Sequence, residues 1–122
     1  LLVAEDRTSE RGTIHFTDLE TECRRSAAQA DVSLREDNSL RFQGSFPESS
    51  TRGELDYFYR QTDERIILDI RSEPTTEPDN FISSCLASVV YDARTEPIDN
   101  GRYVVEVRHN REEVRKFVLR VN

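Results

Sequence analysis

The apolar residues of this chain recur at every second position, and this period of two is the feature that most constrains its fold. Ala30, Val32 and Leu34, for example, alternate with Asp31 and Ser33. Such alternation places apolar side chains on one face of a β-strand and polar side chains on the other. Similar runs recur at spacings of roughly 8–15 residues, with turn-forming residues between them. We therefore expect an all-β fold, an antiparallel two-sheet sandwich of about seven or eight strands.

The expected strands lie around residues 14–16, 30–34, 40–46, 55–59, 66–70, 81–93, 103–107 and 117–121. The turn signal of residues 36–39 predicts that the second and third of these strands form a hairpin. Residues 72–80 contain Pro74 and Pro78, so we expect them to form an exposed loop.

A chain of 122 residues is long enough for one hydrophobic core, and it contains no internal repeat and no long linker. We expect one sandwich domain over residues 12–122, preceded by a flexible segment or edge strand over residues 1–11. The apolar start, Leu1 to Ala4, is either the end of a signal peptide or a first strand. No run of residues approaches the roughly 20 apolar positions of a membrane span.

The charge is acidic, with 17 basic and 24 acidic side chains and a formal net charge of −7. Sixteen of the basic residues are arginine, and Lys116 is the only lysine. Along the chain the basic residues are interleaved with acids, so no basic face is evident. Because nucleic acids and anionic membranes bind to clustered lysine and arginine, we expect neither as a partner.

The chain has two cysteines, Cys23 and Cys85, with no paired spacing and no clustered histidines. This arrangement is unsuited to zinc, and we expect a disulfide in a secreted or cell-surface protein. Closing a loop of about 60 residues would stabilise the fold by roughly 4 kcal/mol. The alternative is a pair of buried free thiols in a cytosolic protein.

One segment near the end of the chain carries the pattern Asp99, Gly101 and Tyr103, followed by alternating valines. It resembles the tyrosine corner of immunoglobulin-like sandwiches, in which the tyrosine hydroxyl bonds back to the chain ahead of the penultimate strand. The resemblance covers about the last third of the chain and implies an immunoglobulin-like or transthyretin-like topology, as in many secreted bacterial and archaeal modules. A fold at this level implies no activity.

The chain departs from antibody domains in two respects. Val105 stands where the second disulfide cysteine would fall, and the chain has no tryptophan. Cys23 and Cys85 would therefore join a different pair of strands.

No catalytic constellation is evident in the sequence, and we expect no catalytic residue, cofactor or metal. His15 alternates with apolar residues and His109 precedes a turn, so we expect both histidines to be solvated. Acid-rich loops around residues 73–80 and 92–100 contain oxygen ligands suited to calcium, but they lack a calcium-loop spacing, and solvated loops are the simpler interpretation.

These features favour a non-catalytic extracellular module for protein interaction or surface assembly, with copies of itself among the possible partners. We single out four apolar side chains as a possible interface: Leu1, Leu2, Val3 and Phe58. One alternative is a subunit of an extracellular fibre joined by exchange of the N-terminal strand. Another is an inhibitor or carbohydrate-binding module that acts through loops such as residues 72–80.

Overall fold

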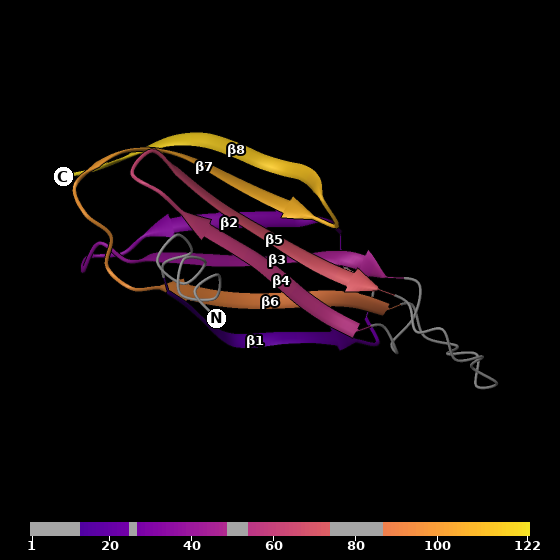
Figure 1. Ribbon diagram of the computed structural model, residues 1–122. Helices are drawn as coiled ribbons and strands as arrows, with labels where there is room; N and C mark the ends of the chain where they lie inside the picture. Colours follow the sequence, from indigo (N-terminus) through magenta and orange to yellow (C-terminus); the bar gives the residue numbers. More distant parts are fainter. Residues whose placement is uncertain (1–12, 25–26, 49–53, 74–86) are drawn as a thin grey trace, which may run out of the picture.

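The computed structural model describes residues 13–24, 27–48, 54–73 and 87–122, and these residues form strands and connecting turns with no helix. Eight strands follow one another along the chain (Figure 1). They are β1 (Ile14–Glu22), β2 (Gln29–Leu34), β3 (Leu40–Glu48), β4 (Glu54–Gln61), β5 (Arg65–Glu73), β6 (Ala87–Thr95), β7 (Gly101–His109) and β8 (Glu112–Val121).

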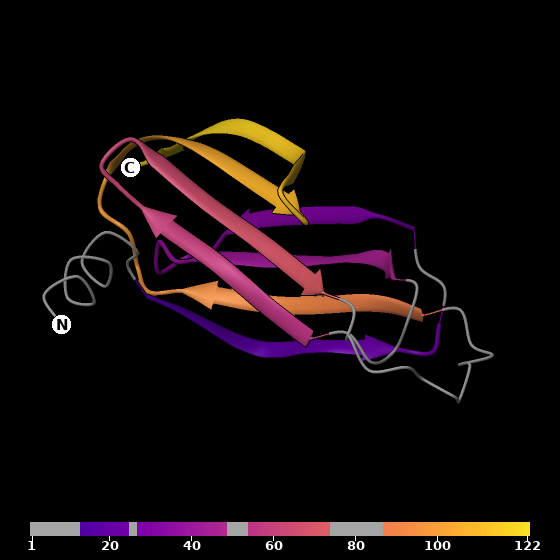
Figure 2. The same ribbon diagram turned by 45° about the vertical axis from the view of Figure 1, so that its right-hand side comes forward.

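The strands form two four-stranded sheets, so the predicted two-sheet sandwich is confirmed. The first sheet has the order β1-β6-β3-β2 and the second the order β4-β5-β7-β8. The sheets lie face to face, and the strands of one cross those of the other at an angle (Figures 1 and 2). The predicted hairpin is present as the antiparallel pair β2–β3.

One pair of neighbouring strands departs from the antiparallel pattern. β5 and β7 pair in parallel, with Ile67 opposite Glu106, whereas the other neighbours are antiparallel. The chain leaves the second sheet after β5, runs through β6 in the first sheet, and returns as β7 in its original direction. Alternating polarity reports the face on which a side chain lies and not the direction of the neighbouring strand, so the sequence pattern does not distinguish this arrangement.

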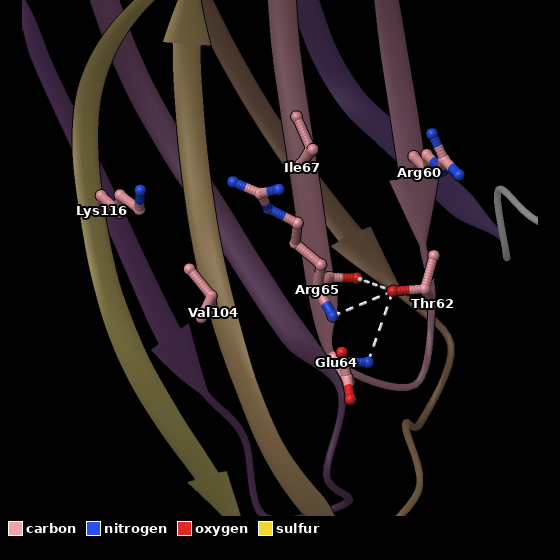
Figure 3. A pocket seen from close by; sticks show the side chains of 7 residues that line it. All are labelled: Arg60, Thr62, Glu64, Arg65, Ile67, Val104 and Lys116. Atoms are coloured by element: carbon pink, nitrogen blue, oxygen red, sulfur yellow. Dashed lines mark hydrogen bonds between the residues drawn. The ribbon is translucent and has the colours of Figure 1, made fainter.

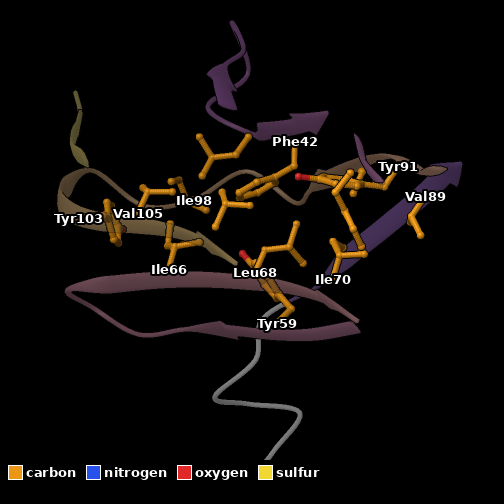
Figure 4. Close-up of a cluster of buried hydrophobic side chains, with 14 of the residues drawn as sticks. Phe42, Tyr59, Ile66, Leu68, Ile70, Val89, Tyr91, Ile98, Tyr103 and Val105 are labelled. Carbon is orange, nitrogen blue, oxygen red and sulfur yellow. The ribbon is translucent and has the colours of Figure 1, made fainter. Parts of the chain in front are cut away.

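The core lies between the sheets and consists of the alternate residues that the sequence pattern identifies. Ile66, Leu68 and Ile70 of β5 are fully buried there (Figure 4). They pack in one cluster with residues of both sheets, including Phe42 and Val105. Burial of these aliphatic and aromatic side chains is the main contribution to the stability of a fold of this size.

β4 differs in part from the expected arrangement. Tyr59 is buried, but Tyr57, which the alternation of residues 55–59 predicts to lie on the same face, is 39% exposed. Because β4 is the edge strand above β1, the Tyr57 ring packs at the open side of the sandwich against Phe16, with 4.6 Å between ring centroids. Phe58 points to the outer face of the second sheet, where the Arg71 guanidinium lies 5.6 Å from the centre of its ring.

The segment that enters β7 is held by the tyrosine of the corner motif. The Tyr103 hydroxyl donates a hydrogen bond of 2.8 Å to the carbonyl oxygen of Asp99, and the ring is buried. The amide of Ile98 donates to the carbonyl of Asn38 in the β2–β3 turn, at 2.9 Å. These bonds tie the crossing between the two sheets to both of them.

Replacing Tyr103 with Phe tests the contribution of this hydroxyl. The substitution keeps the buried ring and leaves the Asp99 carbonyl without its donor, so we expect the free energy of unfolding to fall by about 1 kcal/mol. Urea denaturation followed by circular dichroism measures the change. Tyr57→Phe is the matched control, because that ring is exposed and its loss of a hydroxyl should change stability by a few tenths of a kcal/mol. Equal effects of the two substitutions would contradict a structural role for the Tyr103 hydrogen bond.

Candidate functional site

A cleft of about 420 Å³ lies on the outer face of the second sheet (Figure 3). Every strand of that sheet contributes to it, together with the β4–β5 turn. Its lining consists of Arg60, Thr62, Glu64, Arg65, Ile67, Val104 and Lys116. The cleft is therefore a product of strand pairing and not of one loop.

The register of the strands explains why cations surround an aliphatic floor. Arg60 pairs with Ile67, Ile67 pairs with Glu106, and Glu106 pairs with Lys116, so these residues form one row across the sheet. In the next row Arg65 pairs with Val104. Side chains at paired positions project from the same face of a sheet. Arg60 and Lys116 thus stand at the two sides, with Ile67 and Val104 between them.

The β4–β5 turn that closes one end of the cleft is held by Thr62. Its hydroxyl oxygen accepts hydrogen bonds from the amides of Glu64 and Arg65, at 3.3 and 3.0 Å (Figure 3). A threonine side chain that bonds to amides two and three residues ahead stabilises a tight turn. This turn sets the position from which the Arg65 side chain leaves the backbone.

A buried carboxylate lies beside the cleft and holds one of its cations. Glu106 is 3% exposed, accepts a hydrogen bond from Arg65 Nη2 at 3.4 Å and is also paired with Arg108. Two guanidinium groups therefore compensate the charge of Glu106. Arg65 keeps 49% of its side chain exposed. Since a guanidinium carries five N–H donors, Arg65 can bind a further anion while it remains paired.

The basic surface continues into a second hollow at the β7–β8 end of the sheet, lined in part by Arg102 and Arg120. These two arginines are exposed and lie directly opposite each other. The next pair toward the cleft is Val104, which also lines the cleft, and Val118, which is 54% exposed. Like charges at directly opposed positions destabilise a sheet, so an anion placed between the two arginines would relieve their repulsion.

We call the combined surface the basic face. Its cations are Arg60, Arg65, Arg102, Lys116 and Arg120, and its aliphatic strip is Ile67, Val104 and Val118. On a chain with a net charge of −7, the second sheet thus gathers exposed positive charge around an apolar strip. Such groups can bind an anion by charge and by hydrogen bonds.

The basic face is not evident in the sequence, because its cations are far apart there and interleaved with acids. Arg65 and Arg102, for example, are brought together only by the parallel pairing of β5 with β7. The one local signal is Lys116, the single lysine, which lies at the cleft.

The structure covers the predicted site residues in part. Cys23 follows the last residue of β1, whereas Cys85 lies outside the described residues, so the disulfide remains a prediction. Leu1, Leu2 and Val3 also lie outside them. Phe58 is on the same outer face as the cleft, half-buried beneath Arg71.

Metal-ligating side chains do not gather in the described part of the chain: no group of three or more His, Cys, Asp or Glu residues there is placed to hold an ion. Most of the first acid-rich loop, residues 74–80, lies outside that part.

The prediction for His109 is wrong. Its side chain is buried, with Nε2 2.8 Å from the Tyr91 hydroxyl oxygen and the ring stacked on Phe46 at 4.4 Å between centroids. The strand β7 extends through His109, so the alternation that buries Val105 and Val107 also turns this histidine inward. His15 is exposed, as expected, and lies 3.2 Å from Glu96.

Burial gives His109 and Tyr91 unusual acid–base properties. Desolvation lowers the pKa of His109 to about 4, although the nearby Asp69 opposes the shift. Desolvation also raises the pKa of Tyr91, so its hydroxyl keeps its proton. Both groups are therefore neutral at pH 7 and form a polar contact inside the core.

Comparison of the chain with protein-family models, curated proteins and solved structures finds no match in any of the three. Nor do the described residues include a helix long and apolar enough to cross a membrane.

The pKa of His109 predicts a pH dependence of stability. The folded state resists protonation until about pH 4, whereas the unfolded histidine is protonated below about pH 6.5. The unfolded state binds more protons in this window, so stability is fully present above it and falls as the pH decreases through it, by roughly 3 kcal/mol. Urea denaturation at a series of pH values measures the slope. His109→Gln should lose this component, and an unchanged slope in the variant would contradict the assignment.

Proposed function

We propose that this chain is a non-catalytic extracellular module of the immunoglobulin-like type, and that it binds a protein partner through the basic face. The observation that carries the proposal is the set of five exposed cations around an aliphatic strip on an otherwise acidic protein. Exposed apolar surface rimmed by charge is typical of interaction sites.

The chemistry of the basic face supports binding rather than catalysis. Guanidinium and ammonium groups hold a negative charge in place, but they do not remove a proton near neutral pH. Both histidines of the chain lie elsewhere, His15 in the first sheet and His109 in the core. Glu64 is the carboxylate among the residues that line the cleft, and no histidine accompanies it there, so we propose that these residues hold a ligand without transforming it.

The overall charge supports a protein partner over a nucleic acid. A polyanion extends beyond the basic face and meets the acidic remainder of the surface, where its phosphates are repelled. A protein can present a few carboxylates around an apolar side chain and leave the rest of its surface outside the contact. Complementary charges of this kind select partners and speed their association.

The strand register supports the disulfide that an extracellular location favours. Glu22, at the end of β1, pairs with Ser88, so the next residue, Cys23, lies level with Ala87. Cys85 precedes Ala87 by two residues, and two extended residues span at most about 7 Å. Because Cys23 lies one strand spacing from Ala87, the chain between Ala87 and Cys85 must turn toward β1 for the two Cα atoms to come within the roughly 4.4–6.8 Å that a disulfide requires.

The disulfide can be tested by thiol titration of the protein purified without reductant and then denatured. We expect no free thiol, and we expect reduction to lower the free energy of unfolding by roughly 4 kcal/mol. The double variant Cys23→Ser with Cys85→Ser is the control, because its stability should not respond to reductant. Two free thiols per chain would contradict the proposal of a disulfide.

The basic face can be tested through Lys116, which is the only lysine in the chain. An amine-reactive reagent followed by peptide mass spectrometry measures the labelling rate of this one side chain. We expect a poly-L-glutamate short enough to lie within the basic face to slow the labelling, and poly-L-lysine of the same length to leave it unchanged. Because the contact is electrostatic, about 0.5 M salt should remove the protection.

A double variant and a matched control make the test specific. Arg102→Ala with Arg120→Ala should reduce the protection of Lys116 without loss of stability, because it removes an opposed pair of like charges. Arg94→Ala, at an exposed position of the first sheet, should change nothing. If poly-L-glutamate does not change the labelling rate of Lys116, the proposed binding surface is wrong. Protection by heparin but not by poly-L-glutamate would overturn the protein partner.

A further inference from the structure

The basic face has a repeat along β7 and β8 that restricts the shape of a ligand. The pair of Glu106 and Lys116 is followed two residues along by Val104 and Val118, and after two more by Arg102 and Arg120. Successive rows are about 6.6 Å apart, because each strand rises about 3.3 Å per residue. A cationic row, an aliphatic row and a second cationic row therefore lie along about 13 Å of the sheet.

The first cationic row is strengthened by Arg65. Its guanidinium reaches Glu106, which lies beside Lys116, although its own backbone pairs with Val104 in the aliphatic row. Arg65 and Arg108 both pair with Glu106 and compensate its negative charge. The positive charge of Lys116 is therefore available to a ligand. The row therefore offers positive charge from two strands.

The aliphatic row and the second cationic row are both energetically unfavourable in the free protein. Arg102 and Arg120 are neighbours of like charge, and 54% of the Val118 side chain is exposed to water. A carboxylate placed between the arginines would relieve their repulsion, and an apolar group laid on Val118 would remove apolar surface from water. The two costs are relieved together only by a ligand that carries both groups at the row spacing.

We propose, building on the function proposed above, that the basic face binds an extended acidic segment of a partner protein with the pattern acid–any–apolar–any–acid. In an extended chain, side chains two residues apart point to the same side and repeat at the spacing of the rows. One acid then meets Lys116 and Arg65, the apolar residue lies on Val104 and Val118, and the second acid meets the paired arginines.

Other anions satisfy only part of this surface. A phosphate ion fits one cationic row and leaves the aliphatic strip in water. An acidic polysaccharide spans both cationic rows but has no apolar side chain for the strip. A run of acids without an apolar residue places a carboxylate over Val104 and Val118, while the Arg65 guanidinium of that row is paired with Glu106 in the neighbouring row. The extended segment is the ligand chemistry that matches all three rows.

The experiment compares two peptides of identical composition on the full chain. Acetyl-Glu-Ser-Val-Ser-Glu-amide has the matched spacing, and acetyl-Glu-Ser-Ser-Val-Glu-amide has the valine moved by one position. Titration followed by backbone amide shifts in nuclear magnetic resonance gives the affinity and the location, and Lys116 labelling gives an independent measure. We expect the matched peptide to bind about fivefold more tightly, the change typical of one exposed charged or apolar contact.

Variants of the protein complete the design. Arg102→Ala with Arg120→Ala should reduce the affinity for the matched peptide about fivefold and leave the peptides nearly equal. Val118→Ser should also remove the difference between the peptides, and Arg94→Ala should preserve it. Unfolding measurements on each variant separate a lost contact from a lost fold.

The outcomes distinguish the two proposals. Preference for the matched peptide, lost in the double variant, supports the extended segment. Equal binding of both peptides, with Lys116 still protected by poly-L-glutamate, overturns the extended segment and leaves the proposed binding surface standing. Stronger protection by heparin fragments than by either peptide overturns a protein ligand. If neither the peptides nor poly-L-glutamate changes the labelling of Lys116, both proposals fail.

Discussion

The parallel pairing of β5 with β7 is the constraint on which the rest of the second sheet depends. It places Arg65 opposite Val104 and Ile67 opposite Glu106, and so joins one hairpin, β4–β5, to another, β7–β8. The register is held at both ends, because the Val104 amide donates to the Glu64 carbonyl at 2.9 Å and the Asn110 amide donates to the Ile70 carbonyl at 2.8 Å. A slip of one residue would exchange the inward and outward side chains of a strand, so the core and the basic face depend on the same register.

The same pairing buries two carboxylates on the outer face of the sheet. Asp69 is fully buried, which is costly for a charged group unless it is paired and hydrogen-bonded. It accepts hydrogen bonds from Arg71 Nε at 3.0 Å and from the Arg111 amide at 3.1 Å. Arg111 has a φ of +70°, a conformation that is unfavourable for a side chain of this size, so Asp69 helps to hold the two-residue turn between β7 and β8. Together with the pairing of Glu106, this gives the arginine bias of the chain a structural role on the outer face.

Most of the fold could be predicted from the sequence, because alternation reports directly which side chains face the core. Two side chains lie where the sequence analysis does not lead us to expect them. Tyr57 has the inward parity of Tyr59 but lies at the open side of the sandwich, and His109 continues the inward parity of β7 two residues beyond the expected end of the strand. The candidate site could not be predicted, because Arg65 joins Arg102 and Lys116 of the β7–β8 hairpin through a parallel crossover that leaves no local pattern. Long-range pairing direction is not encoded in the period of a single strand.

A basic face on an acidic chain discriminates between partners by size as well as by charge. Screening at physiological salt limits the reach of each charge to about 8 Å, so at contact the cations of the face outweigh the net charge of the whole chain. A partner whose acids extend further than this beyond the face meets the acidic surface that gives the chain its charge of −7. The arrangement therefore favours a short acidic segment and opposes a long polyanion. Specificity of this kind depends on the repulsion around the site as much as on the attraction within it.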